Sequence, residues 1–271
     1  MPTTHKLPGI SCICVTYARP HLLEEAIHSF LLQDYAGAKE LIVLNDYTPQ
    51  ILEFEHPEVE IINLPYRFRT VGEKMNAAVS MARYDLICLW DDDDIVLPHR
   101  LALAGQRVTT QLFRSNFAWK WDGGELSGPM RSAFHAGSCY PRSLFDWVGG
   151  YAPLGNGQDR EFEGELSRIA PDRLECVDLP PEQVYYIYRW EGTGSYHLSE
   201  WGEGVSGEDK AAAYVQQQVE RGELAQGTIH LRPHWKEDYL QRVRLACASK
   251  EAETAGMKTS GLGDADNAFG S

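Results

Sequence analysis

Four consecutive aspartates, Asp91 to Asp94, follow the apolar run YDLICLW and stand directly before the apolar run IVLPHRL. Adjacent carboxylates repel one another unless a cation or water screens them. A buried strand that ends here would deliver all four to one place, and hard divalent cations prefer carboxylate oxygens. The run therefore predicts a site for a divalent metal ion.

An acidic run has a second interpretation. Aspartate is favoured at helix N-caps and in first helical turns whatever the function, so residues 91–94 are also compatible with a solvated turn or a helix start. An EF-hand calcium loop is excluded, because the acids are contiguous and no Gly or late Glu follows at the required offsets.

Strand and helix patterns alternate over the first hundred residues. The predicted strands are 10–16, 39–46, 59–65 and the run that leads into Asp91, and the predicted helices begin at Pro20 and Val71. This alternation is typical of a doubly wound α/β fold with a mostly parallel sheet. Ligands of such sheets bind beyond the carboxyl ends of the strands, where Thr16, Asp46 and Asp91 lie. We expect these three side chains to converge on one crevice.

The second half of the chain has a mixed pattern. A helix is predicted over 97–113, and aromatic alternation with the turn Asp122-Gly123-Gly124 predicts antiparallel strands over 117–140. Further helices are predicted from Pro141, from Gly157, over 209–222 and over 235–250, with strands at 174–180 and 183–190. We expect one domain over 1–204, a C-terminal helical extension over 205–255 and a small, polar, disordered tail over 256–271.

Composition narrows the partners. The chain has 271 residues, 43% of them hydrophobic, and a formal net charge of −14, which opposes binding to nucleic acid. No segment approaches the roughly 20 apolar residues that span a bilayer, and no basic leader precedes an apolar core. We expect a cytoplasmic protein that contacts, at most, the inner face of a membrane. The cysteines are expected to be reduced and structural, and none has zinc spacing.

Several segments, in order and spacing, carry a family resemblance. They are VTYARPHLLEEAIHSFLLQDY, LIVLND, VGEKMNAAV, LICLWDDDDIVLPHRL, HAGSCYPRSLFDWVGGY and GQDREFEGELSR. Together they resemble the family-two inverting glycosyltransferases of the GT-A fold over about residues 10 to 200. The resemblance implies a metal-dependent, hexosyltransferase-like enzyme that moves a sugar from a nucleotide-diphosphate donor, most often a UDP-sugar, to a hydroxyl of a glycan, glycolipid or protein-linked acceptor.

The resemblance also assigns the donor site. The aspartate that holds the base or ribose falls on Asp46, and the DxD element falls on Asp91 and Asp93, the second of which ligates Mn²⁺ or Mg²⁺. Asp92 and Asp94 are neighbours of that element, with Asp94 a candidate N-cap of the next helix. The residues assigned to the nucleotide sugar are Thr16, Tyr17, Arg19, Asp46, Lys74, Asn76, Asp91 and Asp92.

Inverting transfer needs a general base that takes the proton of the acceptor hydroxyl on the face opposite the leaving group. The family's base is the Asp of a Glu-Asp pair at a helix start, which here reads Gln158-Asp159. The resemblance therefore implies Asp159. Position 158 departs from the family pattern, and a one-residue shift of the alignment would promote Glu161 or Glu163 instead.

Other residues have weaker assignments. His197 lies where relatives have a C-terminal segment over the donor site and is a candidate second metal ligand, with Trp190, Tyr196 and Trp201 around it as candidate sugar-stacking rings. Arg19, Arg69 and Lys74 are candidates to neutralise the diphosphate. His135 and Cys139 fall in the segment that borders the acceptor.

Two other functions share parts of this pattern. A sugar-1-phosphate nucleotidyltransferase needs a glycine-rich phosphate loop after the first strand, where this chain has Tyr17-Ala18-Arg19-Pro20. A sugar-nucleotide-binding module without turnover is favoured by Gln158 and by Met75, which replaces a commoner basic residue. Retention of Asp91, Asp93 and Asp159 favours the enzyme.

Overall fold

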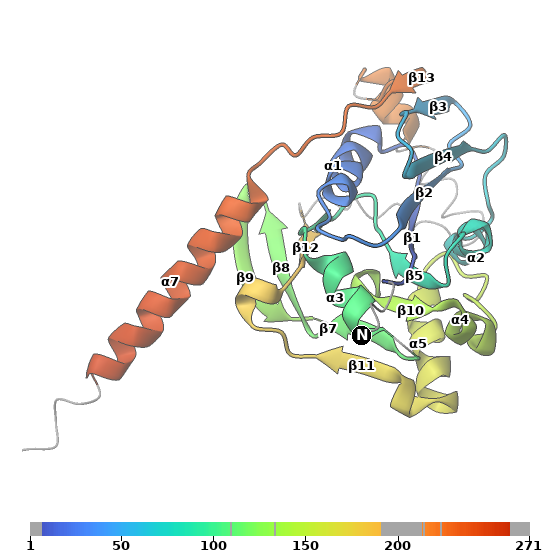
Figure 1. Cartoon of the computed structure of the whole chain (residues 1–271). Helices are drawn as coiled ribbons and strands as arrows, with labels where there is room; N and C mark the ends of the chain where they lie inside the picture. Colours follow the sequence, from blue (N-terminus) through green and yellow to red (C-terminus); the bar gives the residue numbers. More distant parts are fainter. Residues whose placement is uncertain are drawn as a thin grey trace, which may run out of the picture.

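The computed structural model describes residues 7–108, 110–132, 134–190, 213, 215–222 and 224–260, the last ten of them by their backbone (Figure 1). The elements are β1 (Ile10–Thr16), α1 (Pro20–Leu31), β2 (Lys39–Asn45), β3 (Gln50–Glu53), β4 (Val59–Asn63), α2 (Val71–Met81), β5 (Leu86–Leu89), β6 (Ile95–Val96), α3 (Arg100–Arg107), β7 (Leu112–Ser115), β8 (Phe117–Asp122), β9 (Glu125–Arg131), β10 (Cys139–Pro141), α4 (Arg142–Val148), α5 (Gln158–Ile169), β11 (Leu174–Val177), β12 (Tyr186–Arg189), β13 (Gly227–His230) and α7 (Tyr239–Ser260).

The central sheet has the strand order β11-β7-β10-β5-β1-β2-β4. Strands β4, β2, β1 and β5 are parallel neighbours, and β10 runs antiparallel between β5 and β7. The chain winds outward from β1 to β4 and then crosses to β5 on the other side of β1. The predicted α/β class with a mostly parallel sheet is confirmed, and the crevice beside β1 lies where such folds bind ligands.

Both faces of the sheet are buried, as a parallel sheet requires. Successive residues of β1 point to opposite sides: Cys12 packs on the side of α1 and α3, and Ile13 packs on the side of α2, α4 and α5. The helices cover these faces with their apolar stripes, for example Phe30 of α1 and Phe162 of α5. Pro20 stands at the start of α1, as the sequence indicates.

A smaller sheet with the order β6-β12-β8-β9 lies beside the central one. The predicted antiparallel pair is the β8–β9 hairpin, whose turn places Gly123 at φ +58 and Gly124 at φ +92. Glycine adopts positive φ at no steric cost, so the double glycine suits both positions of this turn. The predicted helix over 97–113 is shorter, because α3 ends at Arg107 and the apolar pair Leu112 and Phe113 enters the central sheet as β7.

The C-terminal segment packs against the body of the fold. Strand β13 runs parallel to β3, two strands that the sequence pattern did not reveal. Farther along, Tyr239 donates a hydrogen bond to the buried Glu25 of α1 at 2.9 Å, and Arg189 pairs with the same carboxylate at 3.1 Å. Helix α7 then leads away from the body (Figure 1) and continues to Ser260, into the stretch expected to be disordered.

Two of the cysteines depart from expectation. Cys88 of β5 and Cys139 of β10 are opposite each other in the antiparallel register and form a disulfide. The sequence predicted reduced thiols, because the pairing of these two distant segments was not readable. Cys12, Cys14, Cys176 and Cys247 take part in no disulfide.

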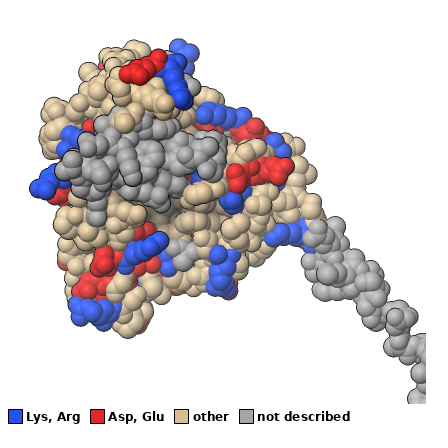
Figure 2. Space-filling model, turned by 180° about the vertical axis from the view of Figure 1, so that it is seen from behind, with Lys and Arg blue, Asp and Glu red and all other residues tan. Residues whose placement is uncertain are grey.

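Charges of both signs are interspersed over the described part of the face shown in Figure 2. Among the described residues, no helix combines the length and apolarity of a membrane span. A cytoplasmic location and a peripheral membrane contact stay predictions from the sequence.

Candidate active site

A cleft of about 370 Å³ opens at the carboxyl ends of β1, β2 and β5. Parallel strands that end at the same edge bring their terminal side chains together, as expected for Thr16, Asp46 and Asp91. The predicted site residues that line the cleft are Thr16, Tyr17, Arg19, Asp46, Arg69, Lys74, Asp91, Asp92, Asp93, His135 and Asp159.

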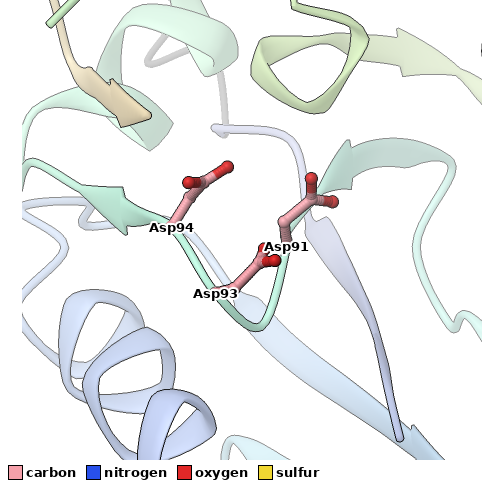
Figure 3. Close-up of side chains that lie close together, drawn as sticks. All are labelled: Asp91, Asp93 and Asp94. Atoms are coloured by element: carbon pink, nitrogen blue, oxygen red, sulfur yellow. The ribbon is translucent and has the colours of Figure 1, made fainter. Parts of the chain in front are cut away.

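Three carboxylates converge in the turn between β5 and β6 (Figure 3). Asp91, Asp93 and Asp94 each offer an oxygen, and these oxygens lie within 4.8 Å of one another. Burial, followed by the charges of Asp93 and Asp92, raises the pKa of Asp91 to about 7. Crowded hard oxygen donors with unfavourable mutual repulsion fit a divalent cation, which would relieve that repulsion.

Arg19, from the loop after β1, lies against this aspartate run. Its guanidinium donates to both carboxylate oxygens of Asp92, at 2.5 and 3.1 Å, and to Asp93 at 2.8 Å. Burial raises the pKa of Asp92 to about 6, even though Arg19 acts in the opposite direction. Asp92 is therefore more than a neighbour of the DxD element, because its carboxylate holds the guanidinium of Arg19 beside Asp93.

Asp94 has a different role from the expected helix N-cap. Strand β6 follows it, and the N-cap of α3 is His99. Its carboxylate accepts hydrogen bonds from the hydroxyl of Tyr186 and, at 2.7 Å, from the backbone N–H of Arg189. Burial raises its pKa well above the usual range. Asp94 thus fastens the aspartate turn to β12.

Asp46 and Lys74 form a buried pair at the end of β2. The Nζ of Lys74 lies 2.5 Å from Asp46 and donates to the carbonyl oxygen of Thr16 at 2.6 Å. The other oxygen of Asp46 accepts from the backbone N–H of Phe68 at 3.0 Å. Burial lowers the pKa of Lys74, and Asp46 opposes that effect. Lys74 therefore orients Asp46 and joins the ends of β1 and β2.

The structure does not bring Asn76 to the cleft lining. Its side-chain amide donates to the carbonyl oxygen of Tyr151 and accepts from the N–H of Tyr151, both at 2.8 Å. These two hydrogen bonds to the backbone of Tyr151 fix the loop that precedes α5. Asn76 therefore acts on the site through Tyr151, which does line the cleft.

Tyr17 and Arg67 form an aromatic and cationic group that also lines the cleft. The guanidinium of Arg67 lies 4.3 Å from the ring centroid of Tyr17, and the same ring packs edge-on against Tyr47 with centroids 5.2 Å apart. Arg67 lies in a loop without a periodic pattern, so no sequence signal distinguished it. The arrangement offers a planar surface beside Asp46.

Asp159 stands in the first turn of α5, after Gly157, which has a φ of +83. An acidic residue is favourable at this end of a helix, because the first backbone N–H groups carry partial positive charge. Asp159 lines the cleft, whereas Glu161 is exposed and Glu163 is engaged with Arg114 and His135. Of these three acids, geometry favours Asp159 as the group that faces a substrate.

Aromatic side chains alternate along β12 and line the cleft on the side of the smaller sheet. Tyr186 and Tyr188 both line it, and Phe134 stacks on Tyr188 with centroids 4.3 Å apart. Trp190 continues the row and is 36% exposed. The sequence analysis predicted a strand over 183–190 but did not assign Tyr186 or Tyr188 to the site, although the alternation of aromatic residues in QVYYIYRW places them on one face of that strand. His197, Tyr196 and Trp201 lie outside the described residues.

The acidic turn makes the metal-free protein sensitive to pH. Because the pKa of Asp91 is raised from its usual 3.8 to about 7, the folded state keeps a proton that the unfolded chain has released. The protonated carboxyl of Asp91 therefore contributes to the free energy of unfolding. This contribution is complete below about pH 4 and is lost as the pH rises through about 7. Melting of the wild type and of Asp91→Asn in chelator, from pH 5 to 8, checks this. The Tm advantage of the wild type should shrink with pH, and a constant difference would contradict it.

The comparisons with known proteins agree with this geometry. Residues 11–107 match the model of glycosyl transferase family 2. S. aureus TarS 1–349 in complex with UDP-GlcNAc superposes with a TM-score of 0.54 at 14% identity, over 78% of this chain and 66% of that one. The mannosyltransferase PcManGT of Pyrobaculum calidifontis, in complex with GDP-Man and Mn²⁺, superposes with a TM-score of 0.50 at 17% identity, over 78% of this chain and 65% of that one.

The chain spans just under two thirds of the length of those two structures, and 39% of the longer S. aureus TarS structure. At these identities the superpositions establish the fold, and the matched family model covers the strands and helices from β1 to α3. The resemblance seen in the sequence is thereby confirmed as far as the comparisons reach: the chain has the GT-A fold, and residues 11–107 match glycosyl transferase family 2.

Proposed function

We propose that this protein is a metal-dependent inverting glycosyltransferase that moves a sugar from a nucleotide-diphosphate donor to an acceptor hydroxyl by single displacement. The observation that carries the proposal is one cleft whose lining includes both the aspartate turn and Asp159. A leaving diphosphate needs positive charge, and an attacking hydroxyl needs a base. The cleft supplies candidates for both.

The leaving-group side consists of the aspartate turn and its cations. Asp91 and Asp93 would hold Mn²⁺ or Mg²⁺, with Asp94 close by but engaged with Tyr186. When bound, the cation neutralises charge that develops on the diphosphate as the glycosidic bond breaks. Arg19 keeps the turn in shape by pairing with Asp92 and Asp93. Arg69, which lines the same cleft, adds positive charge toward the phosphates.

The nucleoside side consists of Asp46 and the ring of Tyr17. Asp46 is oriented by Lys74, so its carboxylate is available in one fixed direction as an acceptor for base or ribose donors. Tyr17, with Arg67 over its ring, offers a surface on which a base can lie. The two relatives bind UDP-GlcNAc and GDP-Man. A UDP-sugar is the donor that we propose first.

On the acceptor side, Asp159 removes the proton of the attacking hydroxyl. An inverting displacement needs this base on the face of the sugar opposite the leaving group. The substituted Gln158 also lines the cleft, so a neutral amide stands where the family has a second carboxylate. One acid is sufficient for the proton transfer itself. Glycans, glycolipids and protein-linked sugars are the acceptor classes that we propose.

Nucleotide release from a panel of UDP- and GDP-sugars, with and without manganese, tests this function. We expect release of UDP from at least one UDP-sugar, faster with manganese and faster again with an acceptor hydroxyl. Donor binding without any turnover would favour the alternative, a sugar-nucleotide-binding module, which the amide at Gln158 supports. Release of pyrophosphate from a nucleoside triphosphate and a sugar 1-phosphate would indicate a nucleotidyltransferase.

Asp46→Ala should weaken nucleotide binding by roughly 10- to 150-fold, with or without manganese, because a charge-assisted hydrogen bond to the nucleoside contributes about 1.5–3 kcal/mol. Calorimetric titration of UDP in chelator and in manganese measures both affinities. The carboxylate also pairs with buried Lys74, so Asp46→Asn serves as a second variant that retains the shape. A loss that occurs only with manganese present would assign Asp46 to the metal instead.

A further inference from the structure

Behind the acceptor side of the cleft, buried polar side chains form a continuous chain of contacts. The Oε1 of Glu163 accepts from Arg114 Nη1 at 2.5 Å and lies 2.7 Å from His135 Nδ1. His135 Nε2 is 2.9 Å from the hydroxyl of Tyr151, which is 2.8 Å from that of Tyr140. The sequence offered Glu163 only as an alternative base and placed His135 near the acceptor; it assigned no role to Arg114, Tyr151 or Tyr140.

The surroundings of Glu163 and His135 determine which of these hydrogen-bonded groups carries a charge. Burial alone would raise the pKa of Glu163, but the hydrogen bond from His135 and the charge of Arg114 outweigh it and lower the pKa. The carboxylate is therefore ionised, and His135 presents an N–H to it from Nδ1. Its Nε2 then accepts from Tyr151, and every polar group between Glu163 and Tyr151 has a partner.

The contacts end on the helix that carries the proposed base. Asp159 and Glu163 are four residues apart on α5 and so lie on the same face, one turn apart. Between them in sequence, Phe162 stacks on Tyr151 with centroids 4.8 Å apart and packs against His135 at 5.5 Å. The ion pair with Arg114 fixes the first turns of α5 against β7, and the ring stack fixes them against the loop between α4 and α5.

We infer that Glu163, held by Arg114 and His135, is a positioning residue that sets the carboxylate of Asp159 toward the acceptor hydroxyl. The inference rests on the proposed function, in which Asp159 is the base. Glu163 does not line the cleft and so acts through the helix and not on the substrate. Small displacements of a catalytic group, of about 1 Å, cost roughly 10²-fold in rate, so the loss of this anchor should be visible in turnover.

Glu163→Gln is the informative change, with Glu161→Gln as its matched control on the same helix, because Glu161 is exposed. The assay uses the full chain with manganese and the UDP-sugar that the donor panel identifies. We expect kcat to fall roughly 10- to 100-fold in Glu163→Gln, with donor affinity within about twofold of the wild type. Glu161→Gln should match the wild type. In an Asp159→Asn background, Glu163→Gln should cause no further loss, because the positioned group is already absent.

The pH profile separates positioning from direct catalysis. If Glu163 positions Asp159, the acidic limb of kcat persists in Glu163→Gln at a lower plateau. Disappearance of that limb would make Glu163 the base and overturn the inference, as would losses that multiply in the Asp159→Asn background. Should Glu163→Gln fail to fold, His135→Ala retains the Arg114 ion pair and should show the same pattern with a smaller loss.

Hydrogen exchange gives a readout that does not depend on turnover. In Glu163→Gln, amides of the first two turns of α5 should exchange at least about tenfold faster than in Glu161→Gln, because the helix start loses its anchor. Unchanged exchange would overturn the inference. If the wild type transfers no sugar while exchange responds as expected, the proposed function fails and the anchoring of α5 stands.

Discussion

Replacing Asp159 with Asn should lower the rate of glycosyl transfer by about 10²- to 10⁴-fold, the usual cost of losing general acid–base help. The amide keeps the shape of the side chain but cannot take the acceptor's proton. Donor affinity should stay within about twofold, because the nucleotide and the metal contact the leaving-group side of the sugar. Steady-state rates together with calorimetric donor titration measure the two quantities.

The same variant distinguishes a base from a helix cap. Asp159 accepts a hydrogen bond from the backbone N–H of Arg160 at 2.8 Å, so part of its role is local. A residue that only stabilised the helix start would cost about 1 kcal/mol in the free energy of unfolding and leave turnover per folded molecule intact. Urea denaturation of Asp159→Asn provides this control. Transfer at near wild-type rate would return Glu161 and Glu163 to consideration.

Asp93→Ala should abolish the gain in nucleotide-diphosphate affinity that manganese provides. Loss of an outer contact to a metal ligand already costs roughly 10- to 100-fold in metal affinity, and loss of the ligand itself should cost at least as much. The fold should persist, because Arg19 keeps its two contacts to Asp92 and the repulsion within the turn decreases. Titration of UDP with and without manganese measures the gain.

A matched control for this variant is Asp85→Ala. It removes the same charge a few residues earlier, from a side chain that is 98% exposed. Its affinity for UDP should increase with manganese as in the wild type. An Asp93→Ala protein that also retains the full gain would show that the cation is held elsewhere, and the remaining candidates in the described turn would be Asp91 and Asp94.

Much of the donor side was predictable, because its signals are local. Strand runs such as 10–16 and 39–45 alternate with amphipathic helices, and in a parallel sheet each strand end places its next side chain at one edge. Thr16, Asp46 and Asp91 therefore meet in the cleft as expected. No knowledge of distant pairing was required.

What the sequence did not reveal depends on contacts between distant segments. Asp94 was expected to cap a helix, but its partner Tyr186 lies 92 residues later in the chain. The anchoring of Glu163 by Arg114 likewise joins residues 49 apart, and it is this contact that separates Glu163 from Asp159 as a candidate base. A periodic pattern describes which face is buried and carries no information on the side chain that will stand opposite.

The buried carboxylate of Glu25 has a consequence for the order in which the protein is made. Its partners Arg189, Lys236 and Tyr239 leave the ribosome long after α1, and the contact with Tyr239 spans 214 positions. Chains are synthesised at about 5–20 residues per second, so α1 waits for roughly ten seconds or more with an acid that has no cation to meet it. We expect a nascent chain arrested before residue 189, which lacks all three partners, to remain sensitive to protease around α1. The full set of contacts of Glu25 in α1 would then form only after the C-terminal segment with Lys236 and Tyr239 has been synthesised.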